Sequence, residues 1–139
     1  MKVAIITDTH FGARNDNLNF NEYFYKFYDN LFFPTLKERG ITTCVHMGDV
    51  VDRRKFISYR IANDFRKRFI GQFQKDGIEL HIIIGNHDTY YKNTNEVNAM
   101  EELVGQDRFK IYTNPEVVEF DGVPIQFIPW INSGNFDAS

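Results

Sequence analysis

Cysteine is almost absent from this 139-residue chain, and long apolar runs are missing. The single cysteine, Cys44, excludes a disulfide within the chain and is typical of a protein from a reducing compartment. No apolar run approaches the ~20 residues that a membrane span needs, and the N-terminal apolar stretch is too short for a signal peptide. These absences predict a cytoplasmic protein with no membrane partner, in which Cys44 is a small core residue.

Positive charge is also in deficit, because 16 Lys and Arg stand against 19 Asp and Glu, for a formal net charge of −3. Attraction of the whole chain to nucleic acid is therefore excluded, and any binding of DNA must depend on a local basic patch. The length predicts one domain, residues 1–139, because two ordinary domains need more chain. The apolar share of 42% is that of a globular protein.

Three short runs rich in Val and Ile predict strands that are buried on both faces: Lys2–Thr7, Thr42–Met47 and Glu79–Ile84. Longer amphipathic segments separate them. This alternation predicts an α/β fold with a parallel β-α-β-α-β core covered by helices. After a short helix at Glu96–Val104, further strands are expected to begin an antiparallel element: Lys110–Thr113, Val117–Phe120 and Val123–Ile128, with a turn at Asp121-Gly122.

Two stripes of apolar side chains at helical spacing are expected to pack against this sheet. The first comprises Phe20, Phe24, Phe27 and Leu31. Pro34 is expected to kink or restart that helix, because proline lacks the backbone N–H of a helix interior. The second stripe comprises Ile57, Ile61, Phe65 and Phe69.

Each predicted core strand runs directly into side chains that can bind a metal ion. The first strand ends at Asp8-Thr9-His10, the second at Gly48-Asp49 with Asp52 shortly after, and the third at Gly85-Asn86-His87-Asp88. Because ligands bind beyond the carboxyl ends of parallel strands, the fold should bring the three clusters together. Carboxylate, carboxamide and imidazole ligands without thiolates favour Mn²⁺, Fe or Zn²⁺. Asp49 lies centrally, where its carboxylate could bridge two ions about 3.5–4 Å apart.

The three clusters resemble the pattern D-x-H, G-D and G-N-H-[DE] of the calcineurin-like metallophosphoesterases, in order and spacing. The resemblance implies the N-terminal part of an αββα sandwich. It also implies that Asp8, His10 and Asp49 bind a first divalent ion, and that Asp49 and Asn86 bind a second. His87 would be the catalytic imidazole, with Asp88 as its partner or as a supporting group. Asp52 is either a supporting group or a helix N-terminal carboxylate.

The stretches GITTCVHMGDVVDRRK, GNHDTYYKN and FIPW are similar to SbcD-type nucleases, including phage recombination endonuclease subunits. That resemblance implies Mn²⁺-dependent exonuclease and endonuclease activity on DNA in recombination and repair. An SMC-like ATPase partner is implied as well, as is a possible homodimer of the full-length form. A phage-encoded member would act in the host cytoplasm. The alternatives are a calcineurin-like phosphoesterase for small nucleotides or phosphoproteins, and a non-catalytic remnant or binding module.

The family completes its site with further histidines, whereas the four histidines of this chain end at His87. We therefore expect a fragment, a split gene product or a truncated domain, in which the incomplete site binds metal weakly and leaves the chain nearly inactive. Next to the expected site, Arg53, Arg54 and Lys55 are candidates for contact with DNA phosphates. Residues 66–68 favour a solvated helix face. Tyr90, Tyr91 and Lys92 fit DNA contact or loop packing equally well. His46 and His81 lie inside predicted strands and are expected to be hydrogen-bonded, buried residues.

Overall fold

The computed structural model describes residues 1–52, 58–85, 88 and 109–132. Its helices and strands follow one another along the chain as β1 (Ala4–Ile6), α1 (Ala13–Asp16), α2 (Leu18–Phe27), the π-helical turn η1 (Tyr28–Phe32), α3 (Phe33–Glu38), β2 (Thr43–His46), α4 (Tyr59–Asp64), the π-helical turn η2 (Phe65–Ile70), α5 (Gly71–Lys75), β3 (Glu79–Ile83), β4 (Phe109–Tyr112), β5 (Glu116–Phe120) and β6 (Val123–Phe127). Within the described ranges, no helix has the length and apolar character needed to cross a membrane.

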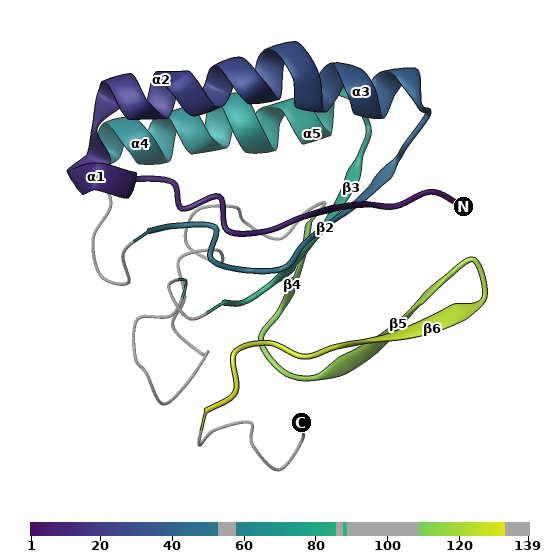
Figure 1. Ribbon diagram of the computed structural model, residues 1–139. Coiled ribbons are helices and arrows are strands. Elements are labelled where there is room, and N and C mark those ends of the chain that lie inside the picture. The colour runs from purple at the N-terminus through teal and green to yellow at the C-terminus, as the bar shows by residue number, and fades with distance from the viewer. Residues whose placement is uncertain (53–57, 86–87, 89–108, 133–139) are drawn as a thin grey trace.

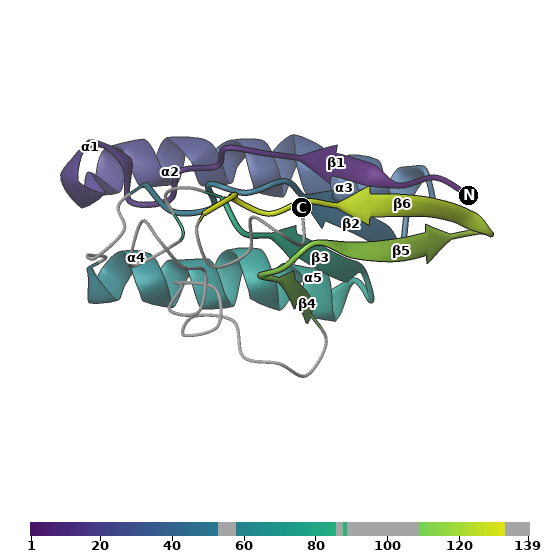
Figure 2. The ribbon, with the colours of Figure 1, turned by 90° about the horizontal axis from the view of Figure 1, so that it is seen from below.

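Four parallel strands form the central sheet in the order β1-β2-β3-β4. The long helices α2–α3 and α4–α5 lie side by side on one face of this sheet, and the hairpin β5–β6 lies on the other (Figures 1 and 2). Both helical connections thus cover the same face, as a regular progression of parallel strands requires. The predicted α/β fold with a parallel core is confirmed.

One strand in the later part of the chain was placed wrongly from the sequence. The segment Lys110–Thr113 was expected to start the antiparallel element, but β4 pairs in parallel with β3, with His81 opposite Lys110. A four-residue run does not reveal its direction, which depends on where the chain returns from, and the predicted helix Glu96–Val104 lies outside the described residues. The other two strands do form an antiparallel hairpin, whose Asp121-Gly122 turn has the positive φ values of 53° and 81° that a two-residue hairpin favours.

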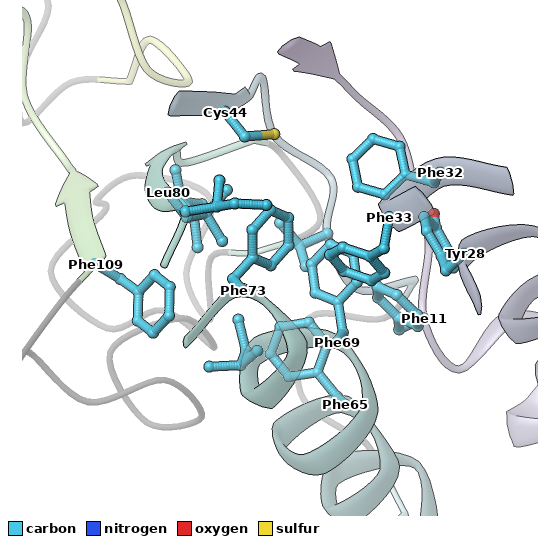
Figure 3. Packing of buried hydrophobic residues seen from close by; sticks show 14 of the residues in the cluster. Phe11, Tyr28, Phe32, Phe33, Cys44, Phe65, Phe69, Phe73, Leu80 and Phe109 are labelled. Atoms are coloured by element: carbon cyan, nitrogen blue, oxygen red, sulfur yellow. The ribbon is translucent and has the colours of Figure 1, made fainter. Parts of the chain in front are cut away.

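The core on the helical side of the sheet is dominated by aromatic rings (Figure 3). Phe69 lies at its centre, with its ring 5.0 Å from that of Phe11 and 5.1 Å from that of Phe73. Edge-on and tilted arrangements predominate, which suits the quadrupoles of the rings. Cys44 is buried in this cluster, as predicted. Phe11, which directly follows the first metal-capable cluster, therefore fixes that segment to the core.

The buried face of α2 is shifted by one position from the predicted stripe, although Phe24 of that stripe, partly buried, does pack against the core. Phe27 and Leu31 are about half exposed, at 48% and 57%. The side chains that face inward from α2 and η1 are Asn21, Tyr25, Tyr28 and Phe32. This helix carries aromatic residues on both faces, so spacing alone selects neither. The second stripe is confirmed for Ile61, Phe65 and Phe69, while Ile57 lies outside the described residues.

Polar partners on the neighbouring helix select the face that α2 buries. Asn21 donates a hydrogen bond of 3.1 Å to the buried carboxylate of Asp64 in α4. The guanidinium of Arg68 lies 4.2 Å from the ring centroid of Tyr25, in cation–π contact. Arg68 is also paired with Glu22 and, at 3.4 Å, with Asp29. These interactions hold α2 against α4 and η2, and they require the face that contains Asn21 and Tyr25.

Candidate metal centre

Three of the predicted ligands converge beyond the carboxyl ends of β1 and β2. Asp8, His10 and Asp49 each offer a ligand atom, and all three atoms lie within 4.8 Å of one another. The segment after β1 continues to pair with the segment after β2, because the amides of Asp8 and His10 donate to the carbonyls of Gly48 and Asp49, each at 3.0 Å. The extended backbone pairing thus brings these residues together, as the parallel-strand argument predicts.

The backbone conformation of these residues is unusual. Asp8, His10 and Asp49 all have positive φ, at 56°, 45° and 53°. A non-glycine residue in this left-handed region costs of order 1 kcal/mol or more and persists only where its surroundings enforce it. All three residues lie in the segments that follow the ends of β1 at Ile6 and of β2 at His46. All three candidate ligands thus have a strained backbone, a feature that they share with Arg14–Asp16 and with Asp121 in the β5–β6 turn.

Two glycines bring the loop after β3 against Asp49. A Cβ atom on Gly85 would lie 2.3 Å from the Asp49 amide nitrogen and 2.5 Å from its Oδ1. A Cβ atom on Gly48 would lie 2.8 Å from the Gly85 Cα, and Gly48 also has a positive φ of 110°. Only glycine at both positions allows the two backbones this close approach. The start of the GNHD segment is thereby fixed next to Asp49.

Hydrogen bonds keep the Asp8 carboxylate ionised. The hydroxyl of Thr7 donates to its Oδ2 at 2.6 Å, and this bond is the main cause that lowers the pKa of Asp8. The other oxygen, Oδ1, lies 3.3 Å from His10 Nε2. The Asp8 side chain is 55% exposed, so an ion or a large substrate can reach it from solvent.

Asp52 lies against the second ring nitrogen of His10. Its Oδ1 is 3.4 Å from His10 Nδ1, while Nε2 points to Asp8. A carboxylate on the far nitrogen is the usual partner of a metal-binding histidine, because it fixes the orientation of the ring. The alternative for Asp52, an N-terminal helix carboxylate, is less consistent with the fold, because α4 begins at Tyr59 and is capped by Ser58.

Asp88 is fully buried and ties two loops together. Its Oδ1 accepts the Val51 amide at 3.1 Å and its Oδ2 accepts the Gly85 amide at 2.9 Å. Burial raises the pKa of Asp88 to about 6, against the effect of these backbone donors. The carboxylate therefore connects the loop after β2 to the loop after β3. This geometry agrees with a supporting role.

Several predicted site residues lie outside the described part of the chain. They are the proposed ligand Asn86, the proposed catalyst His87, the basic residues Arg53, Arg54 and Lys55, and the segment Tyr90–Lys92. The predicted solvated helix face holds for Arg66 and Lys67, which are exposed, but not for Arg68, which packs on the Tyr25 ring and pairs with Glu22 and Asp29. Arg60 pairs with Asp64 at 3.3 Å.

The two strand histidines are buried and hydrogen-bonded, as predicted. His46 is fully buried at the end of β2. His81 contacts the Tyr112 hydroxyl at 2.7 Å and Glu79 at 3.0 Å, on the face of the sheet that carries the hairpin. Thr9, between two candidate ligands, was not among the predicted site residues. Thr9 is buried. Its position between two metal-capable residues was the one feature of the sequence that could have marked it as part of the site.

The three converging side chains fit a divalent cation. Two carboxylates and an imidazole form a mixed oxygen and nitrogen donor set, which suits Mn²⁺, Fe²⁺ or Zn²⁺. Ligand atoms around one such ion lie about 3–4.5 Å apart, given bonds of about 2.0–2.2 Å. The observed limit of 4.8 Å needs only a small contraction of the side chains. The site thus has the composition and nearly the dimensions of a metal centre.

Three comparisons show what this chain is similar to. A family model described as calcineurin-like phosphoesterase matches residues 1–136. The chain is 40% identical over 100 residues to "Exonuclease subunit 1" of Enterobacteria phage T4, which covers 71% of this chain and 29% of that protein. The chain thus spans less than a third of that relative's length. A solved structure of a protein of unknown function from Aquifex aeolicus aligns with a TM-score of 0.47 at 20% identity, covering 89% of this chain and 57% of that one.

The family model covers nearly the whole chain, and it confirms the resemblance that the three strand-end motifs indicate. The described residues add a parallel sheet with a carboxylate and imidazole cluster at the expected edge. The chain belongs to the calcineurin-like phosphoesterase family, a family of metal-dependent phosphoester hydrolases.

Proposed function

We propose that residues 1–139 belong to one metallophosphoesterase domain of an SbcD-type DNA nuclease. The observation that carries the proposal is the convergence of Asp8, His10 and Asp49 at the carboxyl edge of a parallel sheet. The likeness to a phage exonuclease subunit supports DNA phosphodiesters as the proposed substrate among those of the family. The exposed carboxylate of Asp8 supports a polymeric substrate, because a long strand can lie across an open site.

In this proposal Asp8, His10 and Asp49 hold one divalent ion, and Asp49 and Asn86 share in holding a second, with Mn²⁺ as the ion. Such a pair supplies an activated water and neutralises the charge that develops on the phosphoryl oxygens. Asp52 orients the His10 ring through Nδ1 so that Nε2 is directed into the site. The hydrogen bond from Thr7, which lowers the pKa of Asp8, favours the ionised carboxylate that a cation requires.

The remaining roles belong to residues around this centre. His87 donates a proton to the departing oxygen of the DNA strand. Asp88 holds the loop that contains His87 against the loop after β2, through the Val51 and Gly85 amides. Arg53, Arg54 and Lys55 bind backbone phosphates, which position the strand without reading its sequence.

The proposed setting is a nuclease complex in recombination and repair, in the host cytoplasm if the chain is phage-encoded. The phage relative is called a subunit, which supports an assembly with other chains. An SMC-like ATPase is the proposed partner, and a homodimer of the full-length form is the proposed oligomer.

Calorimetric titration of the 139-residue chain with Mn²⁺ tests the metal centre. Asp49→Asn should abolish binding, because it removes the charge of the shared ligand and leaves the backbone unchanged. Asp121→Asn is a matched control, since Asp121 has the same φ of 53° in an exposed turn. Equal binding by Asp49→Asn and the wild type would refute the site. A stoichiometry of one ion would refute the two-metal part of the proposal for this chain.

Hydrolysis assays test the substrate. Slow Mn²⁺-dependent degradation of linear duplex or single-stranded DNA, lost in Asp49→Asn and retained in Asp121→Asn, is the expected result, because none of the four histidines of this chain follows His87. Hydrolysis of a small phosphodiester ester without any action on DNA would favour the alternative, a phosphoesterase for small substrates. Tight metal binding without hydrolysis of either substrate would favour the non-catalytic alternative.

A further inference from the structure

The buried imidazole of His46 connects the two loops that contain the candidate metal ligands. His46 is the last residue of β2 and is completely shielded from solvent. Its Nε2 lies 3.0 Å from the Oγ1 of Thr9, which is placed between Asp8 and His10. Its Nδ1 accepts the backbone N–H of Gly48, the neighbour of Asp49, at 3.1 Å. One ring therefore contacts both loops.

The donors and acceptors around His46 fix a single arrangement of protons. Because the Gly48 amide can only donate, Nδ1 must be the unprotonated nitrogen, and the neutral ring carries its proton on Nε2. That proton is donated to Thr9 Oγ1, and the Thr9 hydroxyl in turn donates to the Val50 carbonyl at 3.0 Å. Burial lowers the pKa of His46 to about 3, which agrees with a ring that stays neutral. Each polar atom of this network thus has a partner.

The network acts where the backbone is strained. Asp8, His10 and Asp49 have positive φ, and such residues hold their conformation only when the surroundings enforce it. The backbone bonds between the two loops are made by Asp8 and His10, on either side of Thr9, whose own side chain is buried between the loops. The Thr9 hydroxyl accepts from His46 and donates to Val50, and these two bonds add a side-chain restraint at the residue between two ligands.

We propose that Thr9 and His46 form a positioning pair that sets the spacing of Asp8 and His10 relative to Asp49, and thereby the affinity of the site for a divalent cation. This inference rests on the proposed metal centre. Neither residue touches the ion or the substrate in this scheme. A second buried histidine shows the contrast, because His81 bonds to Tyr112 and Glu79, away from the ligand loops.

Two substitutions at Thr9 distinguish the effect of its hydroxyl group from the effect of its side-chain volume. Thr9→Val keeps the volume and loses both hydrogen bonds, whereas Thr9→Ser keeps the hydroxyl. Thr9→Val is expected to weaken Mn²⁺ binding about 10- to 100-fold, the usual effect of losing a group that orients a metal ligand, and Thr9→Ser should restore it. His81→Gln serves as the control for a buried histidine, and should leave the Mn²⁺ affinity unchanged while lowering the Tm of the metal-free protein.

Two substitutions at His46 test its contact with Thr9 and its contact with the Gly48 amide separately. Gln carries a donor that can reach Thr9 but no acceptor at the place of Nδ1, whereas Asn carries an acceptor for the Gly48 amide but cannot reach Thr9. Both His46→Gln and His46→Asn should therefore weaken Mn²⁺ binding, each through the loss of a different contact. An unchanged affinity in both variants would overturn the proposed pair.

Hydrogen exchange of the metal-free chain tests the pair independently of metal binding. The amides of Asp8 and His10 donate to the loop after β2, so their exchange reports on the contact between the loops. Thr9→Val should accelerate their exchange about tenfold, as expected for a lost hydrogen bond, with recovery in Thr9→Ser and no change in His81→Gln. Unaltered exchange in Thr9→Val would refute the pair. If the wild type fails to bind Mn²⁺ but these exchange rates change as expected, the proposed function fails while the positioning pair stands.

Discussion

The close contact between Gly48 and Gly85 makes Gly85→Ala the most informative single substitution in the candidate site. The added methyl group would lie 2.3 Å from the Asp49 amide nitrogen, against an ordinary contact of at least 3.4 Å. The atoms that it meets are backbone and the Asp49 carboxylate, so no flexible side chain can give way. The loops after β2 and β3 must therefore move apart by about 1 Å.

This displacement has an expected cost in stability and in metal binding. Overpacking of this kind costs about 1–3 kcal/mol, and at roughly 4 °C per kcal/mol for a chain of this size the Tm should fall by about 4–12 °C. Because Asp49 is the shared ligand of the proposal, a shift of about 1 Å should weaken Mn²⁺ binding about tenfold or more. Differential scanning calorimetry and Mn²⁺ titration measure the two effects.

Gly71→Ala is the matched control for Gly85→Ala. Gly71 begins α5, has an ordinary helical φ, and a Cβ atom there would meet only the Arg66 carbonyl, at 3.2 Å. Both substitutions reduce the entropy of the unfolded chain by the same amount, so their difference isolates the clash at the site. If Gly85→Ala is as stable as Gly71→Ala and binds Mn²⁺ as the wild type does, the argued contact between the two loops is wrong.

Two further predictions concern stability. Burial lowers the pKa of His81, which is faced by Glu79, Lys110 and Tyr112, so the contribution of this neutral ring to the free energy of unfolding is complete above the unfolded pKa of about 6.5 and is lost as the pH falls below it. Between pH 7.5 and 5.5, urea titrations should show a smaller loss of unfolding free energy in His81→Gln than in the wild type. Equal losses in the two proteins would contradict this prediction. Asp64→Ala removes the buried acceptor of Asn21 and should cost about 1–3 kcal/mol in the same assay, whereas Asp76→Ala, whose partner Gln72 is half-buried, should cost less.

The strand ends of this fold can be predicted from the sequence because each core strand is a short apolar run followed directly by a cluster of polar, metal-capable residues. Runs of Val and Ile between polar clusters leave few arrangements other than buried parallel strands. Parallel strands bring their carboxyl ends to one edge, which is enough to predict that Asp8, His10 and Asp49 converge. Their positive φ values are not predictable in this way, because they follow from how two loops meet.

Other features depend on partners that sequence spacing does not reveal. The sequence predicted the wrong buried face for α2, because Asn21 and Tyr25 face inward to contact Asp64 of α4 and Arg68 of η2. The direction of β4 depends on the route of the chain before it rather than on its own residues. The link between Thr9 and His46 joins residues far apart in the chain, and a threonine between two ligands is ordinary in composition.

The π-helical turns η1 and η2 have a consequence for insertions and deletions. A π-helical turn bonds residue i to residue i+5, so it accommodates one residue more than an α-helical turn while the flanking helices keep their orientation. Loss of one residue within 28–32 would restore a regular α-helix, with Tyr25 and Leu36 still directed into the core. The long helices can therefore change in length by one residue at these turns without rotating the surfaces on either side. Related chains that differ by one residue there would be expected to share the same core.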